Sequence, residues 1–198
     1  MIVNNEILLK IYSYVKKEVI KKGFEKEINW YDNIPSLDQI SKWFFFREYC
    51  WVVLNSGMKN SVAEKIFDTF WNNGDFNFEA IKHPNKNKSI KEVYAKLDRY
   101  FTNVKNSKNI LKYLETLPHI GPITKFHLAK NLGFNCGKPD RHLERITSFF
   151  ECSSVQDFCK DVSEISNDKI SVVDVVFWRF ATLFDNYIEI FQELINKK

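Results

Sequence analysis

The stretch LPHIGPITKFHLAKNLGFNCGKPDRHLERI, residues 117–146, is the most informative part of the sequence. Pro122 suits the first position of a helix, because its φ is already helical and the N–H it lacks would be unpaired there. Gly121, just before it, can adopt backbone angles that other residues avoid. These features predict two short helices joined by a tight turn, a hairpin over residues 110–133.

The turn of this hairpin has the chemistry of a phosphate-binding site. The backbone N–H groups from Gly121 to Thr124 would point outward at the positive end of a helix, which suits an anion. Lys125 and Lys130 could strengthen the contact from the second helix. An ordinary helix pair packed by its apolar residues explains the same pattern almost as well, so the hairpin alone does not decide the function.

A single acid follows the hairpin at a defined distance. Asp140 lies nineteen positions after Gly121 and directly before the helical pattern RHLERITSFF. An aspartate in this place is most often the N-cap of the helix it precedes. Taken alone, Asp140 therefore predicts a cap and nothing more.

The composition is that of a helical protein with an ample core. Of the 198 residues, 44% are hydrophobic and 18 are Phe, enough for one domain or two small lobes that share a core. The net charge of +4 agrees with nucleic-acid binding but also with many enzymes that never contact it.

Hydrophobic spacing at three and four residues predicts an all-α protein of about nine or ten helices with no strand. The first helix ends at Gly23, and a second, apolar nearly all round and therefore central, begins at Ser36 and continues to Asn55. The further helices are expected after a cap at Asn60 or Ser61, at Ile90–Asn103 after a polar loop, after a cap at Ser107, and near Arg141–Phe150, Val155–Val162 and Val172–Ile195.

The cysteines and histidines show no metal-site spacing. Cys152 and Cys159 form a C-x6-C pair, but the two further cysteines of an iron–sulfur loop do not follow, so no cluster is expected. None of the four histidines has zinc-ligand spacing, and we expect neither zinc nor an organic cofactor. The charged N-terminal segment predicts neither a signal peptide nor a membrane span, which favours a cytoplasmic location.

Together, these motifs resemble the helix-hairpin-helix DNA glycosylase superfamily. LPHIG matches its hairpin, GFNCGKP its loop, Asp140 its acid, and DRHLERI its D-x-H-hydrophobic-x-R pattern; upstream, CWVVLNSGMKNSVAEKIF is similar to its buried helix and minor-groove loop. The resemblance covers roughly Ile40–Ile146. It implies a two-lobed helical glycosylase fold over 1–198, with one lobe at 30–135 and the other at 1–29 plus 136–198.

Two positions depart from the family pattern. His119 stands where the first hairpin glycine is usual, which puts the hairpin geometry in question. Ile123 stands where strand-cleaving members carry a lysine, and an aliphatic side chain cannot form a Schiff base. The resemblance therefore implies a monofunctional enzyme of base excision repair that leaves an abasic site, although Lys125 and Lys138 keep a lyase activity open.

The resemblance also implies roles for individual residues. Asp140 would be catalytic, and a monovalent cation would bind backbone carbonyls at the hairpin. The expected DNA contacts are His119, Gly121, Ile123, Thr124, Lys125, His142 and the loop residues Met58 and Asn60. The expected base-pocket residues are Trp30, Glu48, Trp51 and Trp178. The expected cation ligands are the carbonyls of Glu115, Leu117 and Ile120.

Alternatives remain for several of these roles. The loop of Met58 could be a plain turn between helices, and Glu48 could simply pair with Arg47 or Arg99. The expected partner is duplex DNA that carries a modified base, bound by a monomer. A DNA-binding hairpin protein without catalysis and a purely structural helical domain are the competing hypotheses.

Overall fold

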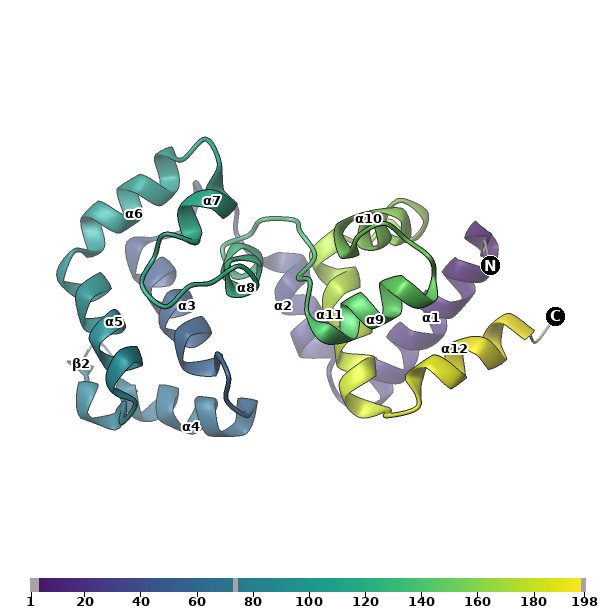
Figure 1. Cartoon of the computed structure of the whole chain (residues 1–198), viewed down its shortest axis with the longest axis horizontal. Coiled ribbons are helices and arrows are strands. Elements are labelled where there is room, and N and C mark those ends of the chain that lie inside the picture. The colour runs from purple at the N-terminus through teal and green to yellow at the C-terminus, as the bar shows by residue number, and fades with distance from the viewer. Residues whose placement is uncertain (1–3, 73–74, 197–198) are drawn as a thin grey trace. The chain divides into compact units, whose positions relative to one another are not determined.

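The computed structural model describes residues 4–72 and 75–196, and within them the chain forms twelve α-helices (Figure 1). It divides into two compact units. Unit 1 consists of Met1–Ile34 and Gly133–Lys198, and unit 2 consists of Pro35–Leu132. The all-α prediction is confirmed, and each unit has a helix of its own at its centre.

Unit 1 is built around α11 (Ile170–Leu183), whose sequence is apolar nearly all round. Four helices pack against it: α1 (Asn5–Lys21), α2 (Glu25–Asn33), α9 (Arg141–Phe149) and α10 (Val155–Ser166). The last helix of the unit, α12 (Tyr187–Asn196), packs on α1. Unit 1 is therefore assembled from both ends of the chain.

Unit 2 is built around α3 (Lys42–Asn55), which is buried on most sides, as its sequence predicts. The four helices that contact α3 are α4 (Asn60–Phe70), α5 (Pro84–Ala95), α6 (Leu97–Asn106) and α8 (Thr124–Asn131). The short α7 (Ile110–Leu114) packs on α8 and completes the hairpin. Figure 1 shows this arrangement of helices around α3.

A small pair of strands corrects the expectation that the chain has none. β1 (Trp71–Asn72) pairs with β2 (Asp75–Phe76) in antiparallel register, and the 3₁₀ helix η1 (Phe78–Ala80) follows. Trp71 lies opposite Phe76, with ring centroids 4.9 Å apart. Strands of two residues are too short to show alternation in the sequence, and the aromatic pair stabilises the pairing of the two strands.

Several predicted helix starts are wrong. The central helix begins at Lys42, where Ser41 accepts a hydrogen bond from the N–H of Phe44, and not at Ser36. The segment expected as a polar loop is the start of α5, because His83 caps it and Pro84 occupies its first turn. The starts of α3 and α5 are therefore determined by local capping residues, which hydrophobic spacing does not reveal.

Other helices were missed, divided or shifted. α2 was not predicted, and the expected helix Val172–Ile195 divides into α11 and α12 at the extended residue Phe184. The single helix expected over Ile90–Asn103 is in fact the end of α5 and most of α6, with Lys96 between the two helices.

The caps of α4 and α7 were also wrongly assigned. α4 begins at Asn60, but Lys59 precedes it as the N-cap, without a side-chain hydrogen bond. α7 is capped by Asn109, whose side chain accepts from the N–H of Lys112, and not by Ser107. Asn and Ser compete for such positions, and spacing alone does not separate them. None of the described helices combines the length and apolar character needed to cross a membrane.

Candidate nucleic-acid interface and active site

The hairpin turn keeps its geometry at the position where glycine was expected. His119 has a φ of 64°, in the left-handed region that favours glycine. Leu117 closes the turn by accepting a hydrogen bond from the N–H of Ile120 at 3.1 Å. The departure at His119 therefore does not prevent the turn from forming.

Three backbone donors of the turn are available to a ligand. The N–H groups of His119, Ile123 and Thr124 make no hydrogen bond to any residue that the structure describes. The N–H of Gly121 is not available, because it donates to the Thr124 hydroxyl at 2.7 Å. Free N–H groups at the start of α8 form a site that suits an anion, although Gly121 does not contribute its own as expected.

The left-handed turn predicts an unusual substitution pattern. Because glycine adopts this φ without strain, His119→Gly should change the free energy of unfolding by no more than about 1 kcal/mol. His119→Val should cost roughly 1–3 kcal/mol, since a β-branched residue is strained there. Urea denaturation followed by circular dichroism measures both.

The matched control is the same change inside a helix. His127→Gly lies in α8 and should cost about 1 kcal/mol or more, because glycine disfavours a helix interior. Equal costs for His119→Gly and His127→Gly would contradict the left-handed turn.

Buried polar contacts hold the hairpin against α3. The Tyr49 hydroxyl donates to the carbonyl of Pro118 at 2.7 Å, and burial raises the pKa of Tyr49, so the phenol keeps its proton. Glu48 accepts from Asn131 at 2.9 Å, and Arg47 pairs with its other oxygen. Burial raises the pKa of Glu48, while Arg47 and Asn131 oppose that shift. The pairing expected between Glu48 and Arg47 is present, so both carboxylate oxygens are engaged.

The two lysines of the second hairpin helix differ in position. Lys125 forms an ion pair with Glu115 at 2.6 Å and lies over the ring of Phe126, at the edge of the turn. Lys130 is only 4% exposed, so the expectation that it contacts phosphate is wrong.

The loop between α3 and α4 is held by a buried lysine. Lys86, on α5, donates to the carbonyls of Leu54 at 2.8 Å and Ser56 at 2.6 Å. Its ammonium group thus satisfies carbonyls that the end of α3 leaves unpaired. The loop then turns at Gly57, which has a φ of 66°; Met58 is half-buried and Asn60 is exposed.

In unit 1, Asp140 caps α9. Its Oδ1 accepts hydrogen bonds from the N–H groups of His142 at 3.0 Å and Leu143 at 3.2 Å, and its Oδ2 lies 3.7 Å from Lys138 Nζ. The capping expectation is confirmed, and the side chain remains 15% exposed. The carboxylate is therefore fixed in place and still partly accessible.

The loop before Asp140 is fastened to unit 1. The N–H of Lys138 donates to the buried Asp174 of α11 at 2.6 Å, and the N–H of Gly137 donates to Gln156 of α10 at 2.9 Å. A Cβ on Gly137 would lie 3.2 Å from Val155, so a larger residue would push the loop away from α10. These contacts fix the loop that leads into Asp140, and thereby the position of Asp140 in unit 1.

The remaining predicted residues are distributed over both units. His142 and Arg145 both lie against the ring of Tyr187, and the pKa of His142 is lowered chiefly by burial. Trp30 and Trp178 belong to unit 1, whereas Glu48 and Trp51 belong to unit 2. Trp51 packs edge-on against Phe67, at 5.7 Å between centroids.

Three residues that position these elements were not predicted as such. Tyr49, Lys86 and Asp174 each hold a backbone group of a candidate site segment. Only Asp174 had a sequence signal, as a lone acid within the apolar run VVDVVF. The partners of Tyr49 and Lys86 lie 69 and 32 positions away, beyond the reach of any local pattern.

Among the described residues, no group of three or more His, Cys, Asp or Glu side chains could hold a metal ion. The expected cation ligands are backbone carbonyls, and that of Leu117 accepts from the N–H of Ile120. A carbonyl has a second lone pair, so this bond leaves it able to bind a cation. The chemistry of these three carbonyls fits a monovalent cation.

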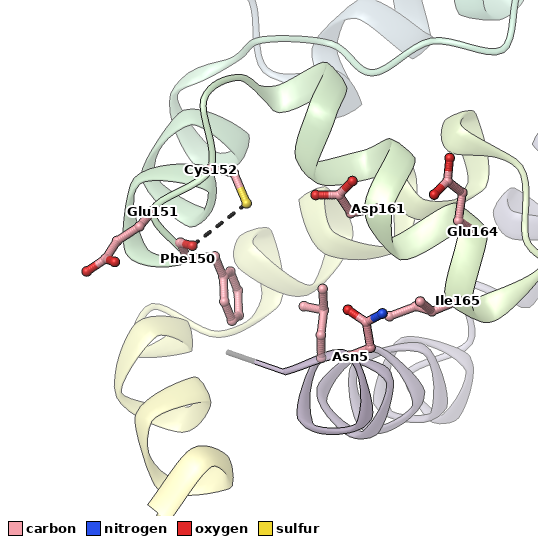
Figure 2. Close-up of a pocket in the computed structure, with 8 residues that line it drawn as sticks. Asn5, Phe150, Glu151, Cys152, Asp161, Glu164 and Ile165 are labelled. Carbon is pink, nitrogen blue, oxygen red and sulfur yellow. Dashed lines mark hydrogen bonds between the residues drawn. The ribbon is translucent and has the colours of Figure 1, made fainter. Parts of the chain in front are cut away.

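A cavity of about 300 Å³ in unit 1 lies apart from the predicted site residues (Figure 2). Its lining includes Glu151, Asp161 and Glu164, and Figure 2 shows the last two extending from α10. Burial, and then Asp161, raise the pKa of the Cys152 thiol. An acidic lining repels phosphate, so this cavity does not suit DNA.

Two solved structures share this fold. The 8-oxoguanine DNA glycosylase of Methanocaldococcus jannaschii is 18% identical, with a TM-score of 0.66, covering 92% of this chain and 99% of that one. The chain has a helical DNA glycosylase fold. The second is the M. jannaschii 8-oxoguanine glycosylase/lyase in complex with 15-mer DNA containing 8-oxoguanine. It is 19% identical, with a TM-score of 0.60, and the match covers 89% of this chain and 98% of that one.

No protein-family model matches the chain, and no curated protein matches it significantly. At these identities the likeness extends to the glycosylase fold only. Within that fold, the hairpin of unit 2 presents free N–H groups, and α9 of unit 1 begins at a capped aspartate.

Proposed function

We propose that the protein belongs to the helix-hairpin-helix superfamily and is a DNA glycosylase of base excision repair. The observation that carries this proposal is the capped, partly exposed Asp140 in a chain with the glycosylase fold. The free N–H groups of the hairpin turn supply a second, independent feature of the same function.

The hairpin would bind the DNA backbone. A phosphate oxygen can accept from the N–H groups of Ile123 and Thr124, and Lys125 adds a positive charge beside them. A modified base must leave the stack before its glycosidic bond can be reached, and an inserted side chain fills the vacancy. Met58, in the loop held by Lys86, is our candidate for that insertion.

Asp140 would act on the sugar. Cleavage of the N-glycosidic bond builds positive charge on the deoxyribose, as in other glycoside hydrolysis. A fixed carboxylate stabilises this charge and can orient or deprotonate the attacking water. Oδ1 holds the helix cap, which leaves Oδ2, beside Lys138, as the oxygen to face the reaction.

The reaction would stop at the abasic site. Ile123 is 48% exposed at the position where strand-cleaving members carry a nucleophilic lysine, and it cannot attack the sugar. The solved neighbour that is named a glycosylase/lyase differs in activity from what we propose here.

The substrate class is a damaged or modified base in duplex DNA. Because both solved neighbours are named for 8-oxoguanine, that lesion is the first to test. We further propose that the protein acts as a cytoplasmic monomer, without an organic cofactor, zinc or an iron–sulfur cluster. A Na⁺ or K⁺ ion at the carbonyls of Glu115, Leu117 and Ile120 would stiffen the hairpin.

The test is a panel of labelled duplexes, each with one lesion or natural base modification. They are incubated with the protein and then treated with alkali, which cleaves the strand at abasic sites. We expect cleavage only after alkali, for at least one base, and no adduct with borohydride. Binding without base release from any duplex would instead identify a non-catalytic DNA-binding protein.

A further inference from the structure

Unit 2 carries a second basic surface, next to the hairpin turn. An open groove of about 510 Å³ runs between η1 and α5, over the apolar residues Ile81 and Pro84. Lys82, Lys88 and Lys91 line it, opposed by a single acid, Glu79. With three positive charges against one negative, the groove favours an anion.

The walls of this groove are fixed, and its charges are available. Asn87 donates to the carbonyls of Phe78 at 2.6 Å and Ile81 at 3.0 Å, which ties η1 and the following segment to α5. Lys88 and Lys91 are one helical turn apart on α5, so they share a face. Lys91 Nζ lies 5.5 Å from the centroid of the Phe78 ring. The pKa of Glu92 is lowered by its hydrogen bond with Lys96 and also by the charge of Lys88. None of the three groove lysines, however, forms an ion pair within the described part of the chain.

The groove lies beside the hairpin turn. His83, between the groove residues Lys82 and Pro84, lies 6.2 Å from His119 between ring centroids, with the rings nearly perpendicular. Both histidines are exposed. His83 Nδ1 accepts the N–H of Lys86 at 3.4 Å, which leaves Nε2 as the ring nitrogen open to a further contact.

We propose that this groove binds the DNA backbone as a second phosphate-binding surface, with His83 as the link to the hairpin. The inference rests on the proposed function, since it requires a duplex already bound at the hairpin. Such a surface would lengthen the contact along the backbone without reading sequence. It would add affinity and salt dependence, while the chemistry at the glycosidic bond would be unaffected.

The test removes the charge of the groove. In a Lys82→Gln/Lys88→Gln/Lys91→Gln variant, duplex affinity measured by fluorescence anisotropy should fall roughly tenfold or more at moderate salt. The slope of log affinity against log salt should become shallower by about 2 to 3, close to one for each phosphate that the variant no longer binds. The fall in affinity should be equal for undamaged and lesion-bearing duplexes, and single-turnover base release at saturating protein should be unchanged.

The control variant removes the same charge elsewhere. Lys17→Gln/Lys26→Gln/Lys160→Gln changes exposed lysines of unit 1 and should leave the salt slope as in the wild type. If the wild type shows no salt-sensitive duplex binding, the proposed function and this inference both fail. If the wild type binds and the groove variant binds equally well, the inference alone fails, and an acidic protein segment becomes the better occupant.

Discussion

Asp140→Asn is expected to lower the rate of base release by roughly 10²- to 10⁴-fold while duplex affinity stays close to that of the wild type. The neutral amide can neither stabilise the positive charge on the sugar nor take a proton from water. Binding persists because the donors that would hold the backbone belong to the hairpin in unit 2. Single-turnover release and anisotropy measure the two quantities separately.

The fold should survive this substitution. Asparagine caps helices as well as aspartate does, so the N–H groups of His142 and Leu143 keep an acceptor. The ion pair with Lys138, at 3.7 Å, is worth roughly 1 kcal/mol or less. Thermal melts of the two proteins should therefore nearly coincide.

Asp157→Asn is the matched control. Asp157 is an acid at the start of another helix of unit 1: it lies in the first turn of α10 and accepts hydrogen bonds from the hydroxyls of Ser153 and Ser154, which precede that helix. Its substitution should leave base release at the wild-type rate. Equal rates of base release by the wild type and Asp140→Asn would contradict the catalytic role of Asp140, whatever the binding data show.

Ile123→Lys is expected to create a strand-cleaving activity that the wild type lacks. The side chain is 48% exposed at the start of α8, so a lysine fits without loss of packing. Its amine could attack the deoxyribose and form a Schiff base, which borohydride reduces to a stable covalent adduct. Adduct formation is measured as a shifted band on a denaturing gel.

Ile123→Arg separates nucleophilic attack from added charge. The guanidinium has a positive charge and similar length but remains protonated and forms no Schiff base. We expect tighter duplex binding from both variants and an adduct from Ile123→Lys alone. A covalent adduct with the wild type would refute the monofunctional assignment, and base release without any adduct from Ile123→Lys would place residue 123 away from the sugar.

The sequence predicted what local chemistry determines. The near-continuous apolar run of α3 identified the central helix of unit 2, and the proline before Asp140 identified the cap of α9. The left-handed angle of His119 was not predictable from histidine itself; the motif around it, with a glycine expected there, was the only indication.

The rest depended on partners that are distant in the sequence. Lys130 reads as a surface lysine in the sequence, and only the folded structure shows that its side chain is buried. Lys86 lay in a segment that we interpreted as a loop. Its role was not predictable, because the carbonyls that it binds lie at the end of another helix, α3. The groove of unit 2 likewise arises only when η1 folds against α5, so no spacing of lysines predicts it.

The discontinuity of unit 1 has a consequence for how the protein is made. Unit 2 is one continuous segment, so all its contacts are within reach once Leu132 has left the ribosome. α1 is synthesised before unit 2, yet it packs on α10, α11 and α12, which follow more than one hundred residues later. The apolar face of α1 therefore stays exposed until the C-terminal third of the chain has been synthesised. We therefore expect α1 to reach its folded packing after unit 2, although it precedes unit 2 in the chain.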